Sequence, residues 1–287
     1  HLYLPDDYVA GEKRPAIVIT PPASGVKEQT AGIYAEKLSK EGYITLAFDP
    51  RGWGESEGHK SYLSPYKIAD DTKNAISFMS TLNEVDTNNI FNLGICMGAG
   101  IAGFETAYDS RVKALAVVSP YLVGPTSFID GFGGAENMRK MVLPGVAQAS
   151  QKYFETGEDT MRKMVPENEE EMKTATPVGI GMMEYYLPGK PGGVPTWRNE
   201  QSLVSGSDLL SFSVFHYLPA LEPVPIYVVY GTEAITADGA IKFYDEHNGT
   251  KEKLVIDGAG HFDLYWMPEY VDPVVEGIAN FLNAYVE

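Results

Sequence analysis

Three features are scarce in this chain of 287 residues, and each scarcity excludes a class of protein. The chain has one cysteine, Cys96, so it can form no internal disulfide. It has 22 basic and 39 acidic residues and a net charge of −17, so nucleic acids and anionic membrane surfaces are poor candidate partners. No apolar run reaches the roughly 18 to 20 residues that a membrane span needs. We therefore expect neither nucleic acid nor a membrane as a partner, in a chain long enough to bury a large core.

The single thiol and the N-terminal residues lead to an expected compartment. The first residues lack the basic, apolar and small-residue segments of a secretory signal. A free thiol works best in a reducing environment, so we expect a cytoplasmic protein. The chain begins at His1 and not at a methionine, which leaves open whether further residues precede it. The sequence allows a homodimer but does not determine the oligomeric state.

Apolar runs alternate with helical periods through the first 120 residues and again near the C-terminus. We expect strands near residues 16–20, 43–48, 90–93, 114–118, 226–230 and 254–256. The helices are expected near residues 30–41, 65–82, 98–108, 237–247 and 271–285. This alternation predicts an α/β fold with a mostly parallel sheet covered by helices.

The alternation stops between residues 121 and 217, a segment too long for a plain loop. We predict one core, residues 1–120 and 218–287, with an inserted, mainly helical cap, residues 121–217, that forms the roof of a substrate pocket. The acidic run 167–171 is expected to be a solvated helix face. The methionines and aromatic residues of the cap either line an apolar cavity or form the core of the cap itself. They are Met138, Met141, Met161, Met164, Met172, Met182, Met183, Phe128, Phe132, Tyr153, Phe154, Tyr185, Tyr186 and Trp197.

Cys96 lies in a glycine-flanked turn, residues 94–98 (GICMG), between an expected strand and an expected helix. Glycines on both sides allow a sharp turn that pushes the central side chain outward, which is typical of a nucleophile elbow. The N–H groups at the helix start are expected to lower the pKa of the thiol, and the N–H of Met97 can stabilise an oxyanion. The alternative is a buried, structural cysteine beside a glycine-rich turn.

A thiol nucleophile needs a base, and His261 follows the last expected strand in the glycine-rich loop 258–262 (GAGHF). The acid is harder to assign, because Ala234 stands about where an aspartate is expected after the preceding strand. Glu233 is the first choice for the acid and Asp238 the second, while Asp263 is expected to support the site from behind or to serve the structure of the loop. A Cys–His pair depends less on a third member than a Ser–His pair does.

A second oxyanion donor is expected in the loop 21–27 (PPASGVK) after the first long strand. Proline has no N–H, so Ala23 offers the first free amide and Ser24 the next. Residues 54–58 (GESEG) match the pattern G-x-S-x-G, yet Ser56 lies in a polar loop and not in a strand-to-helix turn. We therefore expect Ser56 to be structural and the nearby Arg51 to pair with an acid.

With these residues, the chain resembles the α/β-hydrolase superfamily over nearly its whole length, and in particular the dienelactone-hydrolase-like enzymes that carry cysteine in the elbow. The chain also resembles a bacterial and fungal group whose motifs are similar to residues 25–30 (GVKEQT), 52–56 (GWGES), 94–98 (GICMG) and 257–265 (DGAGHFDLY). The resemblance implies a Cys–His–acid site on Cys96 and His261. The missing aspartate at Ala234 and the long cap depart from true dienelactone hydrolases, and some similar fungal proteins are acyl or polyketide transferases.

We therefore expect an enzyme that cleaves an ester, thioester or lactone of a small, apolar acyl substrate through an acyl-thioenzyme at Cys96. Nothing in the motifs requires a cofactor or a metal ion. Two alternatives stay open. The same thiol can transfer the acyl group to an acceptor other than water, or the chain can be a ligand-binding homologue with weak catalysis, for which the missing acid is the best support.

Overall fold

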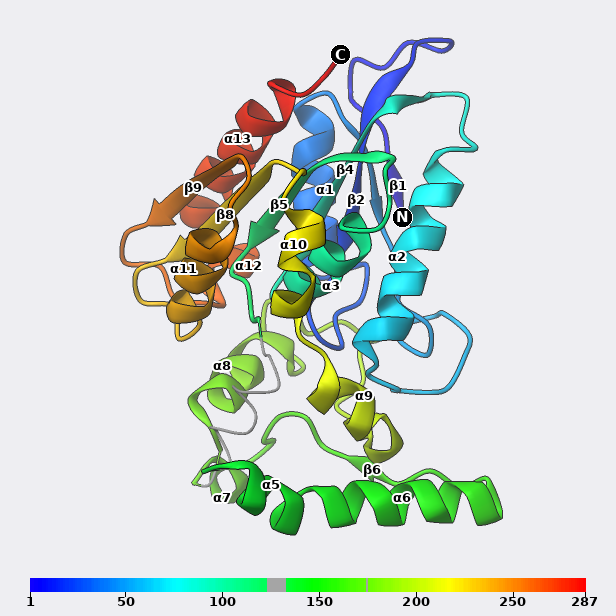
Figure 1. Cartoon of the computed structure of the whole chain (residues 1–287), viewed down its shortest axis with the longest axis vertical. Coiled ribbons are helices and arrows are strands. Elements are labelled where there is room, and N and C mark those ends of the chain that lie inside the picture. The colour runs from blue at the N-terminus through cyan, green and yellow to red at the C-terminus, as the bar shows by residue number, and fades with distance from the viewer. Residues whose placement is uncertain (123–132, 174) are drawn as a thin grey trace.

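The computed structural model describes residues 1–122, 133–173 and 175–287, and a seven-stranded sheet forms its centre (Figure 1). The sheet has the order β1-β3-β2-β4-β5-β8-β9, in which β1 is antiparallel to β3 and the remaining pairs are parallel. The mostly parallel sheet predicted from the sequence is confirmed. Its strands are β1 (Leu2–Tyr3), β2 (Arg14–Thr20), β3 (Ile44–Ala47), β4 (Val85–Ile95), β5 (Val112–Val118), β8 (Ile226–Gly231) and β9 (Lys251–Ile256).

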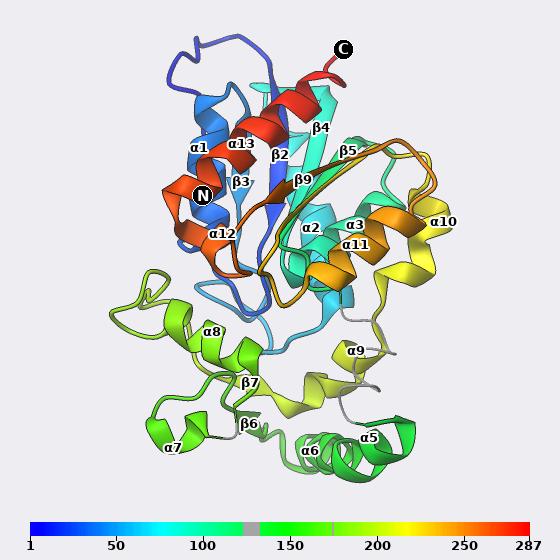
Figure 2. The ribbon, with the colours of Figure 1, turned by 90° about the vertical axis from the view of Figure 1, so that its left-hand side faces the viewer.

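Helices cover both faces of this sheet (Figure 2). One face carries α1 (Thr30–Lys40), α13 (Pro268–Asn283) and the short α12 (Asp263–Trp266), and the other carries α2 (Pro65–Met79), α3 (Met97–Thr106) and α11 (Ala237–Glu246). Side chains alternate between the faces of a strand, so a strand covered on both sides is apolar throughout. In β2, Ile17 and Ile19 join the apolar cluster under α1 and α13, while Ala16 and Val18 join the cluster under α2.

The expected helices and strands all occur, with small shifts at their ends. Two features escaped the sequence pattern. β1 has two residues, too few for an alternation to show, and β4 begins at Val85, five positions before the expected start. The first residues of β4 include the exposed polar side chains of Thr87 and Asn88. The expectation rested on the apolar run 90–93, which lies in the buried part of the strand.

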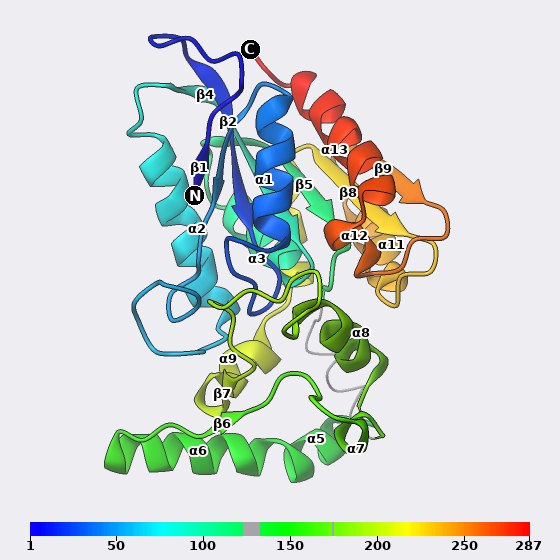
Figure 3. The ribbon, with the colours of Figure 1, turned by 180° about the vertical axis from the view of Figure 1, so that it is seen from behind.

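The segment between β5 and β8 gathers at the end of the sheet where the parallel strands finish (Figure 3). Its strands β6 and β7 pair with each other and do not join the main sheet. The described elements are α5 (Ala135–Met141), α6 (Leu143–Thr156), β6 (Met161–Arg162), α7 (Glu169–Met172), α8 (Pro177–Tyr186), β7 (Gln201–Ser202), η1 (Leu203–Ser205), α9 (Gly206–Ser211), η2 (Val214–Tyr217) and α10 (Leu218–Leu221). Of these, η2 and α10 pack against α3 of the core.

The acidic run in this segment forms α7 and its approach, and it lies largely in solvent, as the sequence predicted. Lys163 pairs with Glu167 at 2.7 Å and with Glu171 at 2.9 Å, which ties the run to the strand β6 nearby. Within the described ranges, no helix is both long enough and apolar enough to cross a membrane.

Candidate active site

Cys96 lies between the last residue of β4 and the first residue of α3, with φ 56° and ψ −121°. A positive φ is strained for a residue with a side chain, so the surroundings must hold it there. A Cβ on Gly98 would lie 2.4 Å from the carbonyl oxygens of Thr20 and Pro21, and one on Gly94 would lie 2.4 Å from that of Gly98. Both glycines are therefore required by close backbone contacts, and the predicted strand, sharp turn and helix are all present.

The backbone N–H groups of Met97 and Ala23 both face the sulfur of Cys96, and each favours its thiolate form. Met97 is the first residue of α3, so its N–H has no acceptor within the helix. Ala23 lies in the loop after β2, the strand next to β4 in the sheet. The two amides that the sequence singled out as oxyanion donors thus converge on the reactive atom.

Burial raises the pKa of the Cys96 thiol to about 11, although hydrogen bonds from Tyr265, Met97 and Ala23 oppose the rise. The expectation that the helix start would leave the thiol with a lowered pKa is wrong, because a thiolate enclosed by protein loses more hydration than these donors replace. At neutral pH Cys96 is therefore a thiol.

His261 is buried in the loop between β9 and α12. Its Nδ1 lies 2.8 Å from Oγ1 of Thr236 and 3.0 Å from Oγ of Ser119, and its Nε2 lies 3.1 Å from the hydroxyl of Tyr265. Burial lowers the pKa of His261 to about 3, so the ring is neutral at pH 7 and can accept a proton. The backbone N–H of Gly260 donates to Asp263 at 2.8 Å, which gives Asp263 the structural role expected of it.

The hydrogen-bond pattern assigns each proton of this group. Ser119 donates its hydroxyl hydrogen to the carbonyl oxygen of His261 at 2.9 Å, so it can only accept from Nδ1–H of the ring. With Nδ1 protonated, Nε2 is an acceptor for Tyr265, whose hydroxyl also faces the sulfur of Cys96. The one hydroxyl hydrogen goes to Nε2 while the sulfur is a thiol and to the sulfur when it is a thiolate. The result is a continuous path from the thiol through Tyr265 to the imidazole.

Glu233 and Asp238 are both exposed, and the structure brings neither to His261. Glu233 borders an outer hollow that His261 also borders, yet no carboxylate of the described residues hydrogen-bonds the ring. Both acids stay predictions without a supporting contact. The residue that does meet Nδ1 from this loop is Thr236, which lies between them in the sequence.

Sequence reasoning missed the three hydroxyls because it searched for a carboxylate. The place of each residue in the sequence could have indicated it. Ser119 directly follows β5, with φ 46°, Thr236 lies in the loop after β8, and Tyr265 is four residues beyond His261 on the short helix α12. Strand ends of a parallel sheet meet at one edge, so polar residues there are candidates for the site.

A cavity of about 370 Å³ lies beside Cys96, with Met97, Ala23, His261 and Tyr265 on its core side. From the segment between β5 and β8 it is lined by Arg162, Met164, Val178, Met182, Tyr186 and Leu209. The expectation that the segment's apolar residues line a cavity is met by Met164, Met182 and Tyr186. Tyr185 and Trp197 instead join the main apolar core that the sheet and its helices form, and not a separate core of the cap. Others, among them Met141 and Phe154, are exposed, and Phe128 and Phe132 lie outside the described residues.

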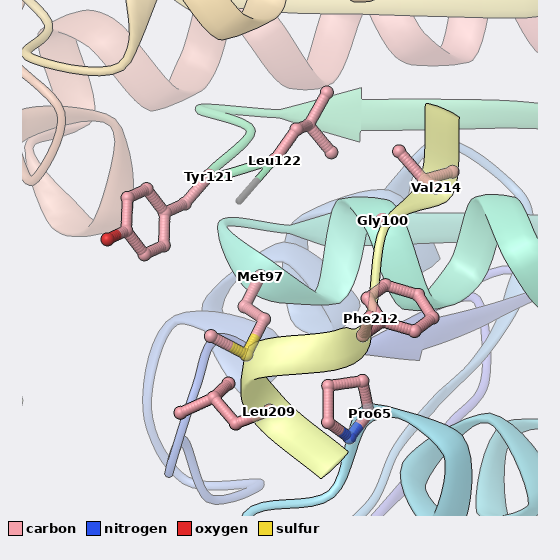
Figure 4. Close-up of a pocket in the computed structure, with 8 residues that line it drawn as sticks. All are labelled: Pro65, Met97, Gly100, Tyr121, Leu122, Leu209, Phe212 and Val214. Carbon is pink, nitrogen blue, oxygen red and sulfur yellow. The ribbon is translucent and has the colours of Figure 1, made fainter. Parts of the chain in front are cut away.

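Figure 4 shows the apolar packing behind one wall of this cavity, where Met97 lies close to Leu209 of α9. A second, smaller hollow lies here against α3, and Pro65, Phe212 and Val214 are among the other residues that line it. No cluster of histidine, cysteine or acidic side chains arranged to hold a metal ion occurs in the part of the chain that the structure describes.

Ser56, the serine of the literal G-x-S-x-G match, does not line the cavity. Its hydroxyl donates to the carbonyl oxygen of Asp49 at 2.8 Å within an exposed loop. Arg51 pairs with Asp71 at 2.6 Å, as predicted. Ser56 therefore helps to shape the loop.

Two relatives match nearly the whole chain. The uncharacterized protein YcjY of Escherichia coli K12 is 30% identical, over 98% of this chain and 92% of that protein. Acyltransferase drtE of Aspergillus calidoustus is 26% identical, over 96% of this chain and 88% of its own length.

Solved structures show the same fold. The crystal structure of hypothetical protein PA2218 from Pseudomonas aeruginosa has a TM-score of 0.88 at 28% identity, over 99% of this chain and 88% of that one. The α/β hydrolase GrgF from Penicillium has a TM-score of 0.82 at 20% identity, over 99% and 92%. The family model described as serine aminopeptidase, S33, matches residues 17–176. The chain has the α/β-hydrolase fold and belongs to this S33 family of α/β hydrolases.

Proposed function

We propose that the protein cleaves an ester, thioester or lactone through an acyl-thioenzyme formed on Cys96, as dienelactone-hydrolase-like enzymes with a cysteine elbow would. The observation that carries this proposal is the convergence on one sulfur of two backbone N–H groups, from Met97 and Ala23, and the hydroxyl of Tyr265, which leads to the buried base His261. A cysteine that only fills space needs none of these partners.

In the acylation step the sulfur of Cys96 forms a bond to the carbonyl carbon. The thiol proton passes to the oxygen of Tyr265 while the hydroxyl proton of Tyr265 passes to Nε2 of His261. The carbonyl oxygen becomes an oxyanion, which the N–H groups of Met97 and Ala23 stabilise. When this intermediate collapses, the bond to the leaving group breaks and the leaving group takes the proton back from the imidazolium.

Deacylation repeats the path with water. The imidazole accepts a proton from the water as the water oxygen attacks the thioester carbon, and the sulfur leaves as the thiol when the proton returns through Tyr265. Ser119 and Thr236 fix the orientation of the ring through Nδ1–H but add no negative charge, so they stabilise the imidazolium less than a carboxylate would. We propose Glu233, or else Asp238, as the acid of the site. Either carboxylate can act on the ring of His261 once the loop that carries it moves toward the ring.

We also propose the division into a catalytic core, residues 1–120 and 218–287, and a cap, residues 121–217. The direct pairing of β5 with β8 supports it, because the sheet is continuous across the inserted segment. The cavity supports it as well, since the inserted segment supplies one of its walls. The substrate is then a small acyl compound with an apolar portion.

The first experiment compares the wild type with Cys96→Ala on p-nitrophenyl butyrate and looks for an acyl adduct by mass spectrometry. We expect turnover to fall to background in the variant, and the wild type to carry one butyryl group on the peptide that holds residue 96. Ser56→Ala is the matched control, because Ser56 is exposed outside the cavity and should keep full activity. Full activity in Cys96→Ala, or an adduct at Ser56, would contradict the proposal.

Acyl transfer is the second candidate, and the name of the relative drtE favours it. An acceptor alcohol or amine of moderate size should then shorten the lifetime of the acyl adduct on Cys96 and appear in an acylated product. If the adduct decays at the same rate with and without such acceptors, hydrolysis is the better description.

A further inference from the structure

Arg162 brings a positive charge into the cavity beside Cys96. It lies in β6, and its register partner in β7 is Gln201. Nε and Nη2 of Arg162 donate to the side-chain oxygen of Gln201 at 3.2 and 2.7 Å, and Gln201 is buried. A neutral amide oxygen holds the guanidinium in place and leaves its charge uncompensated.

This lack of a carboxylate partner is unusual in so acidic a chain, whose net charge is −17. Four other arginines each form an ion pair with a carboxylate: Arg14, Arg51, Arg111 and Arg198. Arg139 has none among the described residues either, but it lies on α5 and does not line the cavity. Arg162 likewise has no ion pair within the described ranges, and it alone of these lines the cavity of Cys96.

The surroundings of Arg162 are apolar on the cavity side. Met164, Val178 and Met182 line the same cavity, and the atoms packed around the guanidinium lower the pKa of Arg162, while the side chain as a whole is exposed to solvent. An arginine stays charged under such conditions. A cation with free N–H groups in a partly desolvated pocket favours a bound oxyanion group more strongly than a cation on an open surface does.

We propose that Arg162 binds a carboxylate or phosphate group of the substrate, so that the enzyme selects acyl compounds that carry an anion beyond an apolar portion. This inference rests on the proposed function of Cys96. The anion can belong to the acyl group, as in the half-ester of a dicarboxylic acid, or to the leaving group, as in a thioester of a phosphorylated carrier thiol. A carboxylate is a planar group and a phosphate a tetrahedral one, and a guanidinium can bind two oxygens of either through two N–H groups.

Two matched pairs of substrates separate these sources. The first pair is p-nitrophenyl hydrogen suberate and p-nitrophenyl octanoate, which differ by the terminal carboxylate. The second is S-octanoyl 4′-phosphopantetheine and S-octanoyl pantetheine, which differ by the phosphate. In the pair that carries the anion at the right place, we expect the wild type to have a higher kcat/KM for the anionic member than for the neutral one. Arg162→Met should reduce this ratio of kcat/KM values by about ten- to a hundredfold.

The neutral member of each pair should change by about twofold or less in Arg162→Met, and Arg162→Lys should keep part of the preference. Lys163→Met is the control, because it removes a neighbouring positive charge that pairs with Glu167 outside the cavity. Equal losses on both members of each pair, or no preference in the wild type, would overturn the inference while leaving the proposed function intact.

If the wild type cleaves neither p-nitrophenyl butyrate nor any of the four compounds, the proposed function fails and binding decides the inference. Suberate and 4′-phosphopantetheine are then added separately, and the melting temperature is measured in the wild type and in Arg162→Met. A rise in the wild type that is absent in the variant supports an anion site at Arg162. The same response in both proteins overturns it.

Discussion

The cavity has two walls of different origin, and they divide the work. The core wall consists of strand ends and the loops that follow them, which place Cys96, Ala23 and His261 against one another. The opposite wall consists of side chains from β6, α8 and α9, such as Arg162 and Met182. Close backbone contacts at Gly94 and Gly98 fix the first wall, while side chains shape the second. Changes in the core wall should therefore alter the rate for every substrate, and changes in the other wall should alter the choice of substrate.

The largest effect is expected from His261→Gln, which keeps an amide of similar size but cannot carry the proton. Loss of a general base reduces turnover by about a hundred- to ten-thousandfold. The measurement is kcat on p-nitrophenyl butyrate and on p-nitrophenyl octanoate, and both should fall by a similar factor. His216→Gln, an exposed histidine, is the control and should be unchanged. If His261→Gln keeps more than about a tenth of the activity, another base serves Cys96.

The same variant tests the lowered pKa of His261 through stability. The ordinary value of 6.5 applies to the unfolded chain and a value of about 3 to the folded one, so the unfolded chain binds more protons between these pH values. The stability that His261 contributes is present above pH 6.5 and is lost as pH falls toward 3. In His261→Gln the free energy of unfolding should decline less over this range than in the wild type. An equal decline would show that the ring is not held neutral by burial.

Tyr265→Phe breaks the path between thiol and imidazole, and we expect the next largest effect. With a proton relay removed, kcat should fall by about ten- to a hundredfold on both esters. The hydroxyl of Tyr265 opposes the rise in the pKa of Cys96. Removing it should raise that pKa further, so less thiolate is present at any pH below it.

Alkylation of the protein's single thiol by iodoacetamide measures this directly. In the wild type the rate should keep rising from neutral pH toward about 11, and in Tyr265→Phe the rise should move to higher pH. Tyr153→Phe, an exposed ring in α6, is the control. A wild-type profile that levels off near the free-thiol value of about 8.5 would contradict the burial of Cys96, and an unchanged profile in Tyr265→Phe would remove Tyr265 from the path.

Those parts of the core wall that depend only on residues close together in the sequence could be predicted from it. Gly94 and Gly98 enclose Cys96 within five residues, and the backbone contacts that require these glycines also direct the N–H of Met97 to the sulfur. Ala23 followed from the prolines before it, which have no N–H to offer. The order of helices and strands followed from apolar periodicity, because buried strands must be apolar on both faces.

The partners of His261 could not be read in this way. Ser119 and Thr236 come from two separate loops and Tyr265 from the short helix α12, and which of their groups meets Nδ1 depends on ångström-scale packing of these segments. The position of Arg162 depends on the pairing of β6 with β7, two residues each, for which no periodic pattern exists. Contacts between short, irregular segments therefore set both the orientation of the base and the charge of the opposite wall.

A smaller effect tests which group orients the imidazole. Thr236→Val removes one acceptor of Nδ1–H and leaves Ser119, so the loss of about one hydrogen bond should lower kcat by roughly fivefold. Glu233→Gln should change kcat by about twofold or less, because the exposed carboxylate makes no contact with the ring. If Glu233→Gln is the more damaging change, the loop moves in solution and Glu233 is the acid after all.

A modest effect, on the choice of substrate and not on the rate for every substrate, is expected on the opposite wall from Met182→Ala in α8. The change enlarges the cavity without touching Cys96 or its partners, so longer acyl chains should gain relative to shorter ones. Each additional buried methylene is worth about 0.8 kcal/mol, or roughly a fourfold gain in kcat/KM, so the ratio of octanoate to butyrate should rise several-fold. Met141→Ala, an exposed methionine in α5, should leave the ratio unchanged. A uniform loss on both esters would mean that this wall also helps to position the catalytic groups, and the division between rate on one side and selection on the other would fail.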